Sequence, residues 1–519
     1  MQSTSQRLFT SLILRKRVLL AAIGMGLLWR IVRYAMNFPL WGDEAFVANN
    51  YFHRGFAGLC RPLDHGQIAP ILFMWLELLA ARFLGCAEWV LRLIPLMAGL
   101  ASVPLFAWLA WRVLGRFPGI LATALFAISY FPVRYSAEVK PYELDLFIAL
   151  GLLALGWRVE KAPGSTLRWA MLIVASAAAV WASYPSVFIS GGIWIALLWV
   201  QRARRAVGIR NLVIFAACLT LSFFLMLRFV AEPQLRAASW LPEIRMWQDA
   251  FPPLAHPWRL PLWLLQVHAG ELLAYPIGGK AGASALSLIL AIAGGIALAR
   301  KRPAWTIMLL APLALNFIAA ALHRYPYGGG PRVSLFMAPA FCLLIGRGVA
   351  SALMVLPAPH LRRIAVGSTL CTLALICVGG IVRDMLKPYH MLSDRENRSL
   401  IHRLAKETMP QDAWVSYIGL TDDAPGPNLY AWGGSAARFR YYLELLAPVP
   451  IHWSPAPQAI QKPETGRIHL LVYRDNKEPF DQSRLDAYLD RAKRAWGPSA
   501  VASTPLGPVE RIDVYRYPP

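Results

Sequence analysis

Residues 18–47 read VLLAAIGMGLLWRIVRYAMNFPLWGDEAFV, an apolar run followed by a Pro- and Trp-containing turn and an acidic pair. The run from Val18 is long enough to cross a bilayer as a helix, which takes about 20 residues. Basic residues precede it and no small-residue cleavage site follows it, so it is predicted to be an uncleaved first span. Asp43 and Glu44 then stand just beyond the membrane surface.

The composition of the whole chain also indicates a membrane protein. Of 519 residues, 57% are hydrophobic and only 16% are charged, whereas soluble domains carry about a quarter charged residues. The net charge of +23 does not indicate nucleic-acid binding, because the basic residues cluster in short loops between apolar runs. That pattern orients membrane proteins and attracts anionic lipid. The predicted partner is therefore a lipid bilayer and no nucleic acid.

About eleven apolar segments approach spanning length: residues 18–36, 88–111, 117–133, 142–157, 167–183, 186–200, 210–230, 282–299, 304–322, 332–350 and 364–382. Basic clusters fall on alternate sides of consecutive spans, which places those loops and the amino terminus in the cytoplasm. Residues 70–84 are apolar but short, and they carry Glu77 and Arg82. We therefore expect an amphipathic juxtamembrane helix on the outer face there rather than a twelfth span.

The predicted fold class is a polytopic α-helical membrane protein with a small C-terminal soluble α/β domain. The membrane domain is expected over residues 1–382, with outer loops at 37–87 and 231–281 that contain juxtamembrane helices. Residues 383–519 are polar, and the spans place them outside the membrane on the non-cytoplasmic side. Periodicity in this tail indicates strands and one helix, at residues 413–417, 468–473, 512–516 and 484–496 respectively.

No metal site is predicted. The six cysteines form no Cys-x-x-Cys pattern and the histidines show no metal-ligand spacing. Cys60 and Cys86 lie in the same outer loop, where they either form a disulfide or remain free thiols. A divalent metal could bridge the acidic residues of the outer loops, but the sequence does not require one.

Two acidic sites in outer loops are candidates for catalysis. The adjacent carboxylates of Asp43 and Glu44 repel each other and lose solvation beside a bilayer, which raises a carboxyl pKa and suits a base that accepts a hydroxyl proton. They could instead form an acidic turn that faces water. The second site, YSAEVKPY at residues 135–142, contains Glu138, with Lys140 and Tyr142 as substrate-binding candidates. Glu138 and Lys140 could instead pair with each other or snorkel.

Other outer-loop residues are candidates for binding substrate. A phosphate needs positive charge and hydrogen-bond donors at membrane depth, although each of these residues could also be an ordinary interfacial anchor. The phosphate-binding candidates are Arg259, Lys280, Tyr325 and Arg332, and the first-loop candidates are His65 and Gln67.

Taken in order, these motifs resemble the GT-C superfamily of integral membrane glycosyltransferases. The nearest branch is the bacterial protein-mannosyltransferase-like group, which includes aminoarabinose transferases of lipid A. The likeness covers roughly residues 10–350. It includes the Asp43-Glu44 pair, the run DHGQIAPILFMWLELLAARFLG from Asp64, the Tyr-Ser-x-Glu-x-Lys-x-Tyr motif around Glu138, and YPYGGGPRVSLFMAP from Tyr325.

The resemblance implies transfer of a sugar from a polyprenyl-phosphate donor to a hydroxyl of a glycolipid, polysaccharide or protein. Transfer would take place on the periplasmic face of a bacterial inner membrane, with the C-terminal domain in the periplasm and no required cofactor. By position, Asp43 resembles the essential first-loop aspartate of the family. Glu44 resembles its neighbour, and Glu138 resembles the acidic residue of the second outer loop.

Two departures from the family argue against aminoarabinose as the sugar. Aminoarabinose transferases have Lys-Pro-Pro before the juxtamembrane helix, where this chain has Gln67-Ile68-Ala69-Pro70, and Arg-Tyr after Asp-Glu, where it has Phe46-Val47. The chief alternative function is a transporter or flippase of lipid-linked sugars. Inverted repeats and mid-membrane ionisable residues would favour this alternative, but the sequence shows no repeat and the acidic candidates lie in predicted outer loops. A catalytically inactive scaffold subunit is a third possibility.

Overall fold

The computed structural model describes residues 4–518 except 202–206, 239–248, 280–281, 418–432, 450, 453–456, 458–462, 464, 476–481 and 507–509. The chain forms two compact units, each built from separate pieces of sequence. Unit 1 comprises Met1–Met36, Ile68–Leu79 and Arg92–Leu386. Unit 2 comprises Asn37–Gln67, Ala80–Leu91 and Lys387–Pro519.

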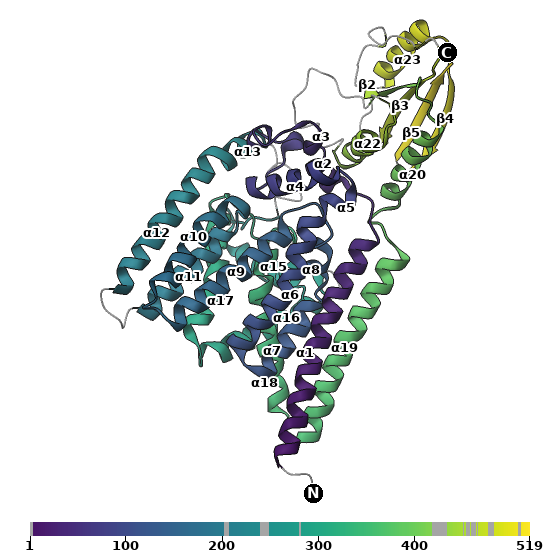
Figure 1. Ribbon diagram of the computed structural model, residues 1–519. Coiled ribbons are helices and arrows are strands. Elements are labelled where there is room, and N and C mark those ends of the chain that lie inside the picture. The colour runs from purple at the N-terminus through teal and green to yellow at the C-terminus, as the bar shows by residue number, and fades with distance from the viewer. Residues whose placement is uncertain are drawn as a thin grey trace. The chain divides into compact units, whose positions relative to one another are not determined.

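Unit 1 is a bundle of apolar helices (Figure 1). Among the described residues, six helices are long and apolar enough to cross a membrane: Lys16–Ala35, Leu93–Leu114, Gly208–Ala237, Pro303–Ala321, Leu335–Val355 and Pro359–Leu386. Four shorter apolar helices are Arg116–Ala127, Thr166–Ala182, Ser186–Gln201 and Ala283–Ala299. A helix therefore lies at ten of the expected positions, and α9 (Tyr142–Lys161) lies at the eleventh. The chain is a mostly helical, multi-pass membrane protein, and the number of spans remains a prediction.

The helical elements of unit 1 follow the apolar runs, and glycine or proline separates several of them; Gly115, with a φ of 83°, lies between α6 and α7. The remaining elements with residues in this unit are α1 (Thr4–Ala35), α4 (Ile71–Leu84), α6 (Leu93–Leu114), α7 (Arg116–Ala127), α8 (Tyr130–Tyr135), α10 (Thr166–Ala182), α11 (Ser186–Gln201), α12 (Val207–Met226), η3 (Leu227–Ala231), α13 (Glu232–Ala237), η5 (Pro257–Arg259), α15 (Leu260–Val267), η6 (His268–Leu272), α16 (Ala283–Ala299), α17 (Pro303–Ala321), η8 (Leu335–Met337), α18 (Ala338–Val355) and α19 (Pro359–Leu386).

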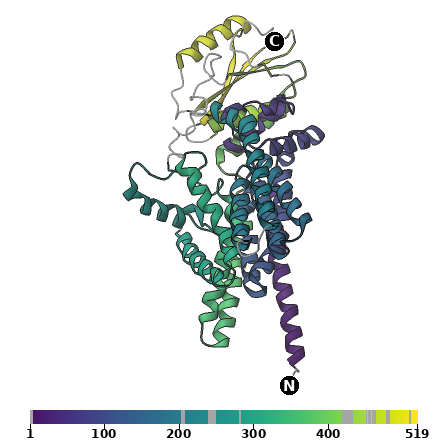
Figure 2. The ribbon, with the colours of Figure 1, turned by 90° about the vertical axis from the view of Figure 1, so that its left-hand side faces the viewer.

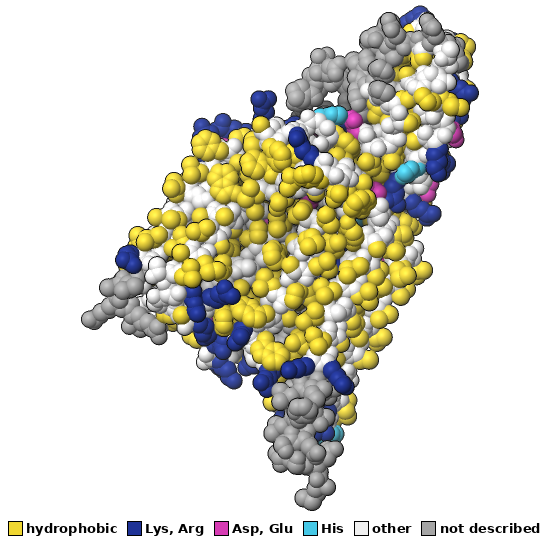
Figure 3. Space-filling view, in the orientation of Figure 1, with side chains coloured by type: hydrophobic (Ala, Val, Ile, Leu, Met, Phe, Trp, Pro, Cys, Tyr) yellow, Lys and Arg dark blue, Asp and Glu magenta, His cyan; other side chains and the backbone are white. Residues whose placement is uncertain are grey.

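Two glycines let α16 and α18 approach closely. A Cβ added at Gly294 would overlap the carbonyl oxygen of Leu344, and one added at Gly348 would overlap that of Leu290. Helices in lipid gain little from the hydrophobic effect, so small residues that permit close backbone packing stabilise their association. The face of the bundle drawn in Figure 3 is largely hydrophobic, with Lys and Arg side chains gathered along its lower edge.

A buried polar contact joins α1 to α19. Arg33 Nη1 lies 2.8 Å from Asp384 Oδ1, and Trp29 Nε1 donates to Asp384 Oδ2 at 2.9 Å. The Arg33 and Asp384 side chains are each only 2% exposed. The first and last helices of the unit are therefore held together by a charge pair, in addition to apolar packing.

Unit 2 contains a five-stranded mixed sheet in the order β2-β1-β3-β5-β4. Strand β1 is parallel to β2 and β3, whereas β5 is antiparallel to β3 and β4. Helix α23 covers one face of the sheet (Figures 1 and 2). The elements of this domain are α20 (Leu392–Glu407), β1 (Ala413–Tyr417), α22 (Gly433–Leu446), β2 (Ile451–His452), β3 (Ile468–Asp475), α23 (Gln482–Trp496), β4 (Ala500–Pro505) and β5 (Glu510–Tyr517).

The first loop contributes short helices to the same unit. They are α2 (Gly42–Ala48), α3 (Asn50–His53), η1 (Gly58–Cys60), η2 (Asp64–Gly66) and α5 (Glu88–Leu91). Cys60 and Cys86 are both free thiols, so of the two possibilities for this pair the structure contains the unpaired one.

Candidate functional site

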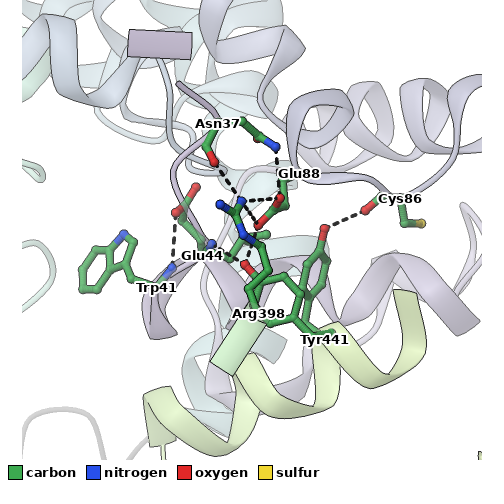
Figure 4. Close-up of polar contacts among 9 residues, drawn as sticks. Asn37, Trp41, Glu44, Cys86, Glu88, Arg398 and Tyr441 are labelled. Atoms are coloured by element: carbon green, nitrogen blue, oxygen red, sulfur yellow. Dashed lines mark hydrogen bonds and ion pairs between the residues drawn. The ribbon is translucent and has the colours of Figure 1, made fainter. Parts of the chain in front are cut away.

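The acidic pair lies in the first turn of α2, where unpaired backbone N–H groups favour negative charge. The two carboxylates have different surroundings. Glu44 is completely buried and accepts a long hydrogen bond of 3.5 Å from the Trp41 backbone N–H (Figure 4). Asp43 is only partly buried. Glu44 therefore stabilises the start of the helix, and Asp43 is the more accessible of the two carboxylates.

His65 lies on the same face of α2 as Asp43. Its ring packs against Phe46 at a centroid distance of 5.1 Å, and Phe46 is one helical turn beyond Asp43. The backbone of His65 is left-handed, with a φ of 57°, which is uncommon outside glycine and recurs at functional sites. Among the described residues, neither ring nitrogen has a hydrogen-bond partner, although both are buried.

Burial lowers the pKa of His65 from 6.5 to about 4; the carboxylate of Asp64 opposes this and Arg440 adds to it. The imidazole is consequently neutral at physiological pH and can donate one hydrogen bond and accept another. Gln67, which is also buried, donates from Nε2 to the His65 carbonyl oxygen at 3.4 Å. The two first-loop candidates are thus adjacent in the fold.

Glu138 belongs to the turn between α8 and α9 in unit 1. It is completely buried, and its Oε1 lies 2.6 Å from Arg134 Nε, one helical turn earlier. Lys140 is 4% exposed, and its backbone N–H donates to the Glu138 carbonyl oxygen at 2.8 Å. The sequence motif therefore forms a tight, buried polar turn.

Besides Asp384, three buried acids of unit 1 were not among the predicted site residues. Glu143 and Asp145 occupy the first turn of α9, and both are almost completely buried. Glu77 on α4 is also buried; neither of its carboxylate oxygens has a hydrogen-bond partner in the described part of the chain, and burial raises its pKa well above the ordinary value. Their occurrence within apolar stretches was the available signal, because acids are costly and rare there.

The predicted phosphate-binding residues have different surroundings. Tyr325 is largely buried, donates its hydroxyl to the Val333 carbonyl oxygen at 3.0 Å, and closes its loop in this way. Burial raises the pKa of Tyr325, with further contributions from Asp145 and Tyr142, so these three side chains lie near one another. Arg332 is half-buried, Arg259 is exposed, and Lys280 lies outside the described residues.

The structure thus brings together Asp43, Glu44, His65 and Gln67 in unit 2, and Glu138, Lys140, Tyr142 and Tyr325 in unit 1. In the described part of the chain, no group of three or more His, Cys, Asp or Glu side chains is arranged to hold a metal ion. The roles of all these residues remain predictions.

The fold of the chain matches that of solved membrane glycosyltransferases along nearly its full length. ArnT from Cupriavidus metallidurans bound to undecaprenyl phosphate matches with a TM-score of 0.54 and 13% identity, over 95% of this chain and 97% of that one. Its apo state matches with a TM-score of 0.51 and 14% identity, over 98% of both chains. The Archaeoglobus fulgidus oligosaccharyltransferase in complex with Zn and sulfate matches with a TM-score of 0.51 and 12% identity, over 95% of this chain and 72% of that one.

These proteins are GT-C membrane glycosyltransferases, so the expected resemblance to the GT-C superfamily is confirmed at the level of the fold. No protein-family model matches the chain, and no curated protein matches it in sequence.

Proposed function

We propose that this protein is a glycosyltransferase that moves a sugar from a polyprenyl-phosphate donor to a hydroxyl of an envelope glycolipid, polysaccharide or protein. The active site would face the periplasm of a bacterial inner membrane. The observation that carries the proposal is the placement of Asp43: a partly accessible carboxylate on the first turn of a short helix, directly after the first span of a GT-C fold.

In the proposed reaction, the acceptor oxygen attacks the anomeric carbon while Asp43 accepts the hydroxyl proton. The bond between the anomeric carbon and the phosphate oxygen breaks, and its electron pair leaves with the polyprenyl phosphate. Attack from the face opposite the leaving group inverts the anomeric configuration. Because phosphate is a good leaving group, it needs positive charge more than it needs a proton. Arg332, Arg259 and Lys280 are the proposed sources of that charge.

The remaining residues are assigned to binding. Neutral His65 is suited to a sugar or acceptor hydroxyl, since it can both donate and accept a hydrogen bond. Gln67 lies beside it. In unit 1, Glu138 would orient donor or acceptor hydroxyls or share the role of base, with Lys140, Tyr142 and Tyr325 as further substrate contacts.

The test is mass spectrometry of envelope glycolipids and glycoproteins from three strains. One lacks the gene, and the other two are the same strain complemented with the wild-type gene or with Asp43→Asn. A general base typically contributes about 10²–10⁴-fold to the rate. We therefore expect Asp43→Asn to lose nearly all of a product that the wild type restores. Glu232→Gln is the matched control, because Glu232 is partly exposed and forms local ion pairs with Arg228 and Arg236 on the same helical segment. Normal product from Asp43→Asn would remove Asp43 from the mechanism.

The same proteins distinguish the enzyme from a flippase. Purified wild-type protein in detergent has no membrane across which to move a lipid, so only an enzyme would transfer sugar there. Extracted membrane lipids from the gene-deleted cells serve as donor and acceptor. Release of polyprenyl phosphate together with the glycosylated product supports the enzyme. Folded protein that forms no glycosylated product in detergent supports the transporter.

A further inference from the structure

Within unit 2, the buried carboxylate of Glu88 links the segment before α2 to the C-terminal domain. Glu88, which is 6% exposed, accepts hydrogen bonds from the side chains of three residues far apart in the sequence. Asn37 Nδ2 lies 3.1 Å from Oε2, and Arg398 Nη1 lies 3.2 and 2.9 Å from the two oxygens. The hydroxyl of Tyr442 donates to Oε1. We call Asn37, Glu88, Arg398 and Tyr442 the Glu88 junction; Figure 4 labels the first three of these residues.

The junction also binds the backbone that leads to Asp43. Arg398 Nη1 donates to the Asn37 carbonyl oxygen at 2.8 Å. The Tyr442 hydroxyl accepts a hydrogen bond of 2.9 Å from the Leu40 backbone N–H. Since Leu40 is three residues before Asp43, the path of the chain into the first turn of α2 is fixed by groups from α20 and α22.

A second set of contacts holds the other end of α2. Asn49, which follows the helix directly, donates from Nδ2 to the Ala437 carbonyl oxygen on α22 at 3.0 Å. Helices α2 and α22 pack against each other. Tyr441 of α22 donates its hydroxyl to the Cys86 carbonyl oxygen at 2.7 Å, close to Glu88 in the sequence. Asp43 therefore lies between two points at which its helix is attached to the C-terminal domain.

The negative charge of Glu88 makes this attachment depend on Arg398 in particular. A buried carboxylate is stable only when it is paired and hydrogen-bonded. Glu88 receives one positive charge from Arg398 and neutral donors from Asn37 and Tyr442, so both of its oxygens are satisfied. Loss of Arg398 would leave the carboxylate buried without its countercharge, and the segment around Leu40 would rearrange to hydrate it.

We infer that the C-terminal domain positions the catalytic carboxylate, and that Glu88, Arg398 and Tyr442 are positioning residues that act through Asp43. This rests on the proposed function, because it assumes that Asp43 is the base. It assigns to residues 387–519 a role in catalysis: α20 and α22 hold α2 in the orientation that transfer requires. Small displacements of a base cost large factors in rate.

The test combines junction variants with Asp43→Asn in the full-length protein. Membranes of gene-deleted cells supply donor and acceptor, and the rate of product formation is measured by mass spectrometry. Arg398→Ala is expected to lower the rate about 10–100-fold, Arg398→Lys to recover part of it, and Tyr442→Phe to lower it several-fold. Arg403→Ala is the matched control, because Arg403 lies exposed on the same helix; it should retain the wild-type rate.

The decisive comparison is made in the Asp43→Asn background. If Arg398 acts through Asp43, Arg398→Ala causes no further loss there, because the group it positions is already gone. A merely structural role would reduce the rate by the same factor in both backgrounds, and that result would overturn the inference. An unchanged rate in Arg398→Ala would overturn it as well. A wild-type rate in Asp43→Asn would instead refute the proposed function, so the two failures are distinguishable.

A second measurement covers the case in which Arg398→Ala lowers the amount of folded protein. Hydrogen exchange of the purified full-length protein reports the opening of the peptide that covers α2. Tyr442→Phe keeps the ring and removes only the hydroxyl, so it should raise exchange in α2 while leaving the unit 1 helices unchanged. Equal exchange in α2 for Tyr442→Phe and wild type would contradict the positioning role.

Discussion

The neutral, buried His65 makes the first loop sensitive to acid. Burial of its ring lowers the pKa of His65 to about 4 in the folded chain, against 6.5 when exposed. A base with a lowered folded pKa contributes its full stability above pH 6.5, and this contribution is lost as the pH falls toward 4. From these two values, the free energy of unfolding attributable to this group falls by about 2 kcal/mol between pH 7 and pH 5.

The perturbation is His65→Asn, which removes the titrating group and retains a residue that tolerates the left-handed backbone. Loss of the contact with Phe46 should lower stability by the same amount at every pH, so the informative quantity is the slope. Hydrogen exchange of peptides covering residues 40–67 in the full-length protein measures the local opening free energy. Wild type should lose about 2 kcal/mol more than the variant between pH 7 and pH 5.

His53→Asn is the control for this experiment. His53 lies in the same loop, but its side chain is exposed and its Nε2 lies 2.9 Å from Glu444 Oε1. Its substitution should leave the acid sensitivity in place. Parallel pH slopes for wild type and His65→Asn would refute the reasoning, because they would show that His65 is not held neutral by its surroundings.

Three further predictions concern packing and charge. Asp384→Ala removes the carboxylate that pairs with the buried Arg33 and should destabilise the protein by about 3–5 kcal/mol, measured as a lower thermal midpoint in detergent. Gly294→Ala should cost about 1–3 kcal/mol through overpacking, whereas Gly295→Ala, whose Cβ would make only an ordinary 4.0 Å contact, should be nearly neutral in the same melting assay. Glu138→Gln should reduce product formation without loss of membrane-inserted protein; normal product would exclude a catalytic or substrate-orienting role for it.

The helical part of the fold was predictable because a bilayer imposes a length and a polarity on each span, and both are local properties of the sequence. Strands β1, β3 and β5 were predictable for a similar reason, since each contains a short run rich in aromatic and β-branched residues. Strand β4, AVASTP, was not predicted because its small residues carry little β preference. The two-residue strand β2 is too short to leave a pattern.

The site was only partly predictable. Asp43 and Glu138 stand out because acids are rare near spans. The buried state of Glu44 and the neutral state of His65 depend on packing, which no spacing in the sequence reveals. The Glu88 junction depends on pairing between Glu88 and Arg398, whose separation along the chain exceeds any local period. Glu88 falls at the start of the span predicted over residues 88–111, and no role was predicted for its carboxylate.

The assembly of unit 2 from distant segments of the chain also has a consequence for biosynthesis. Residues 37–67 and 80–91 leave the ribosome early, yet the strands and helices that complete their unit begin only at Lys387. At 5–20 residues per second, the intervening roughly 300 residues take on the order of tens of seconds to synthesise. During that interval the segment that carries Asp43 lacks its packing partners. The segment that carries Asp43 is therefore expected to reach its packed conformation only after the strands and helices that follow Lys387 have been synthesised.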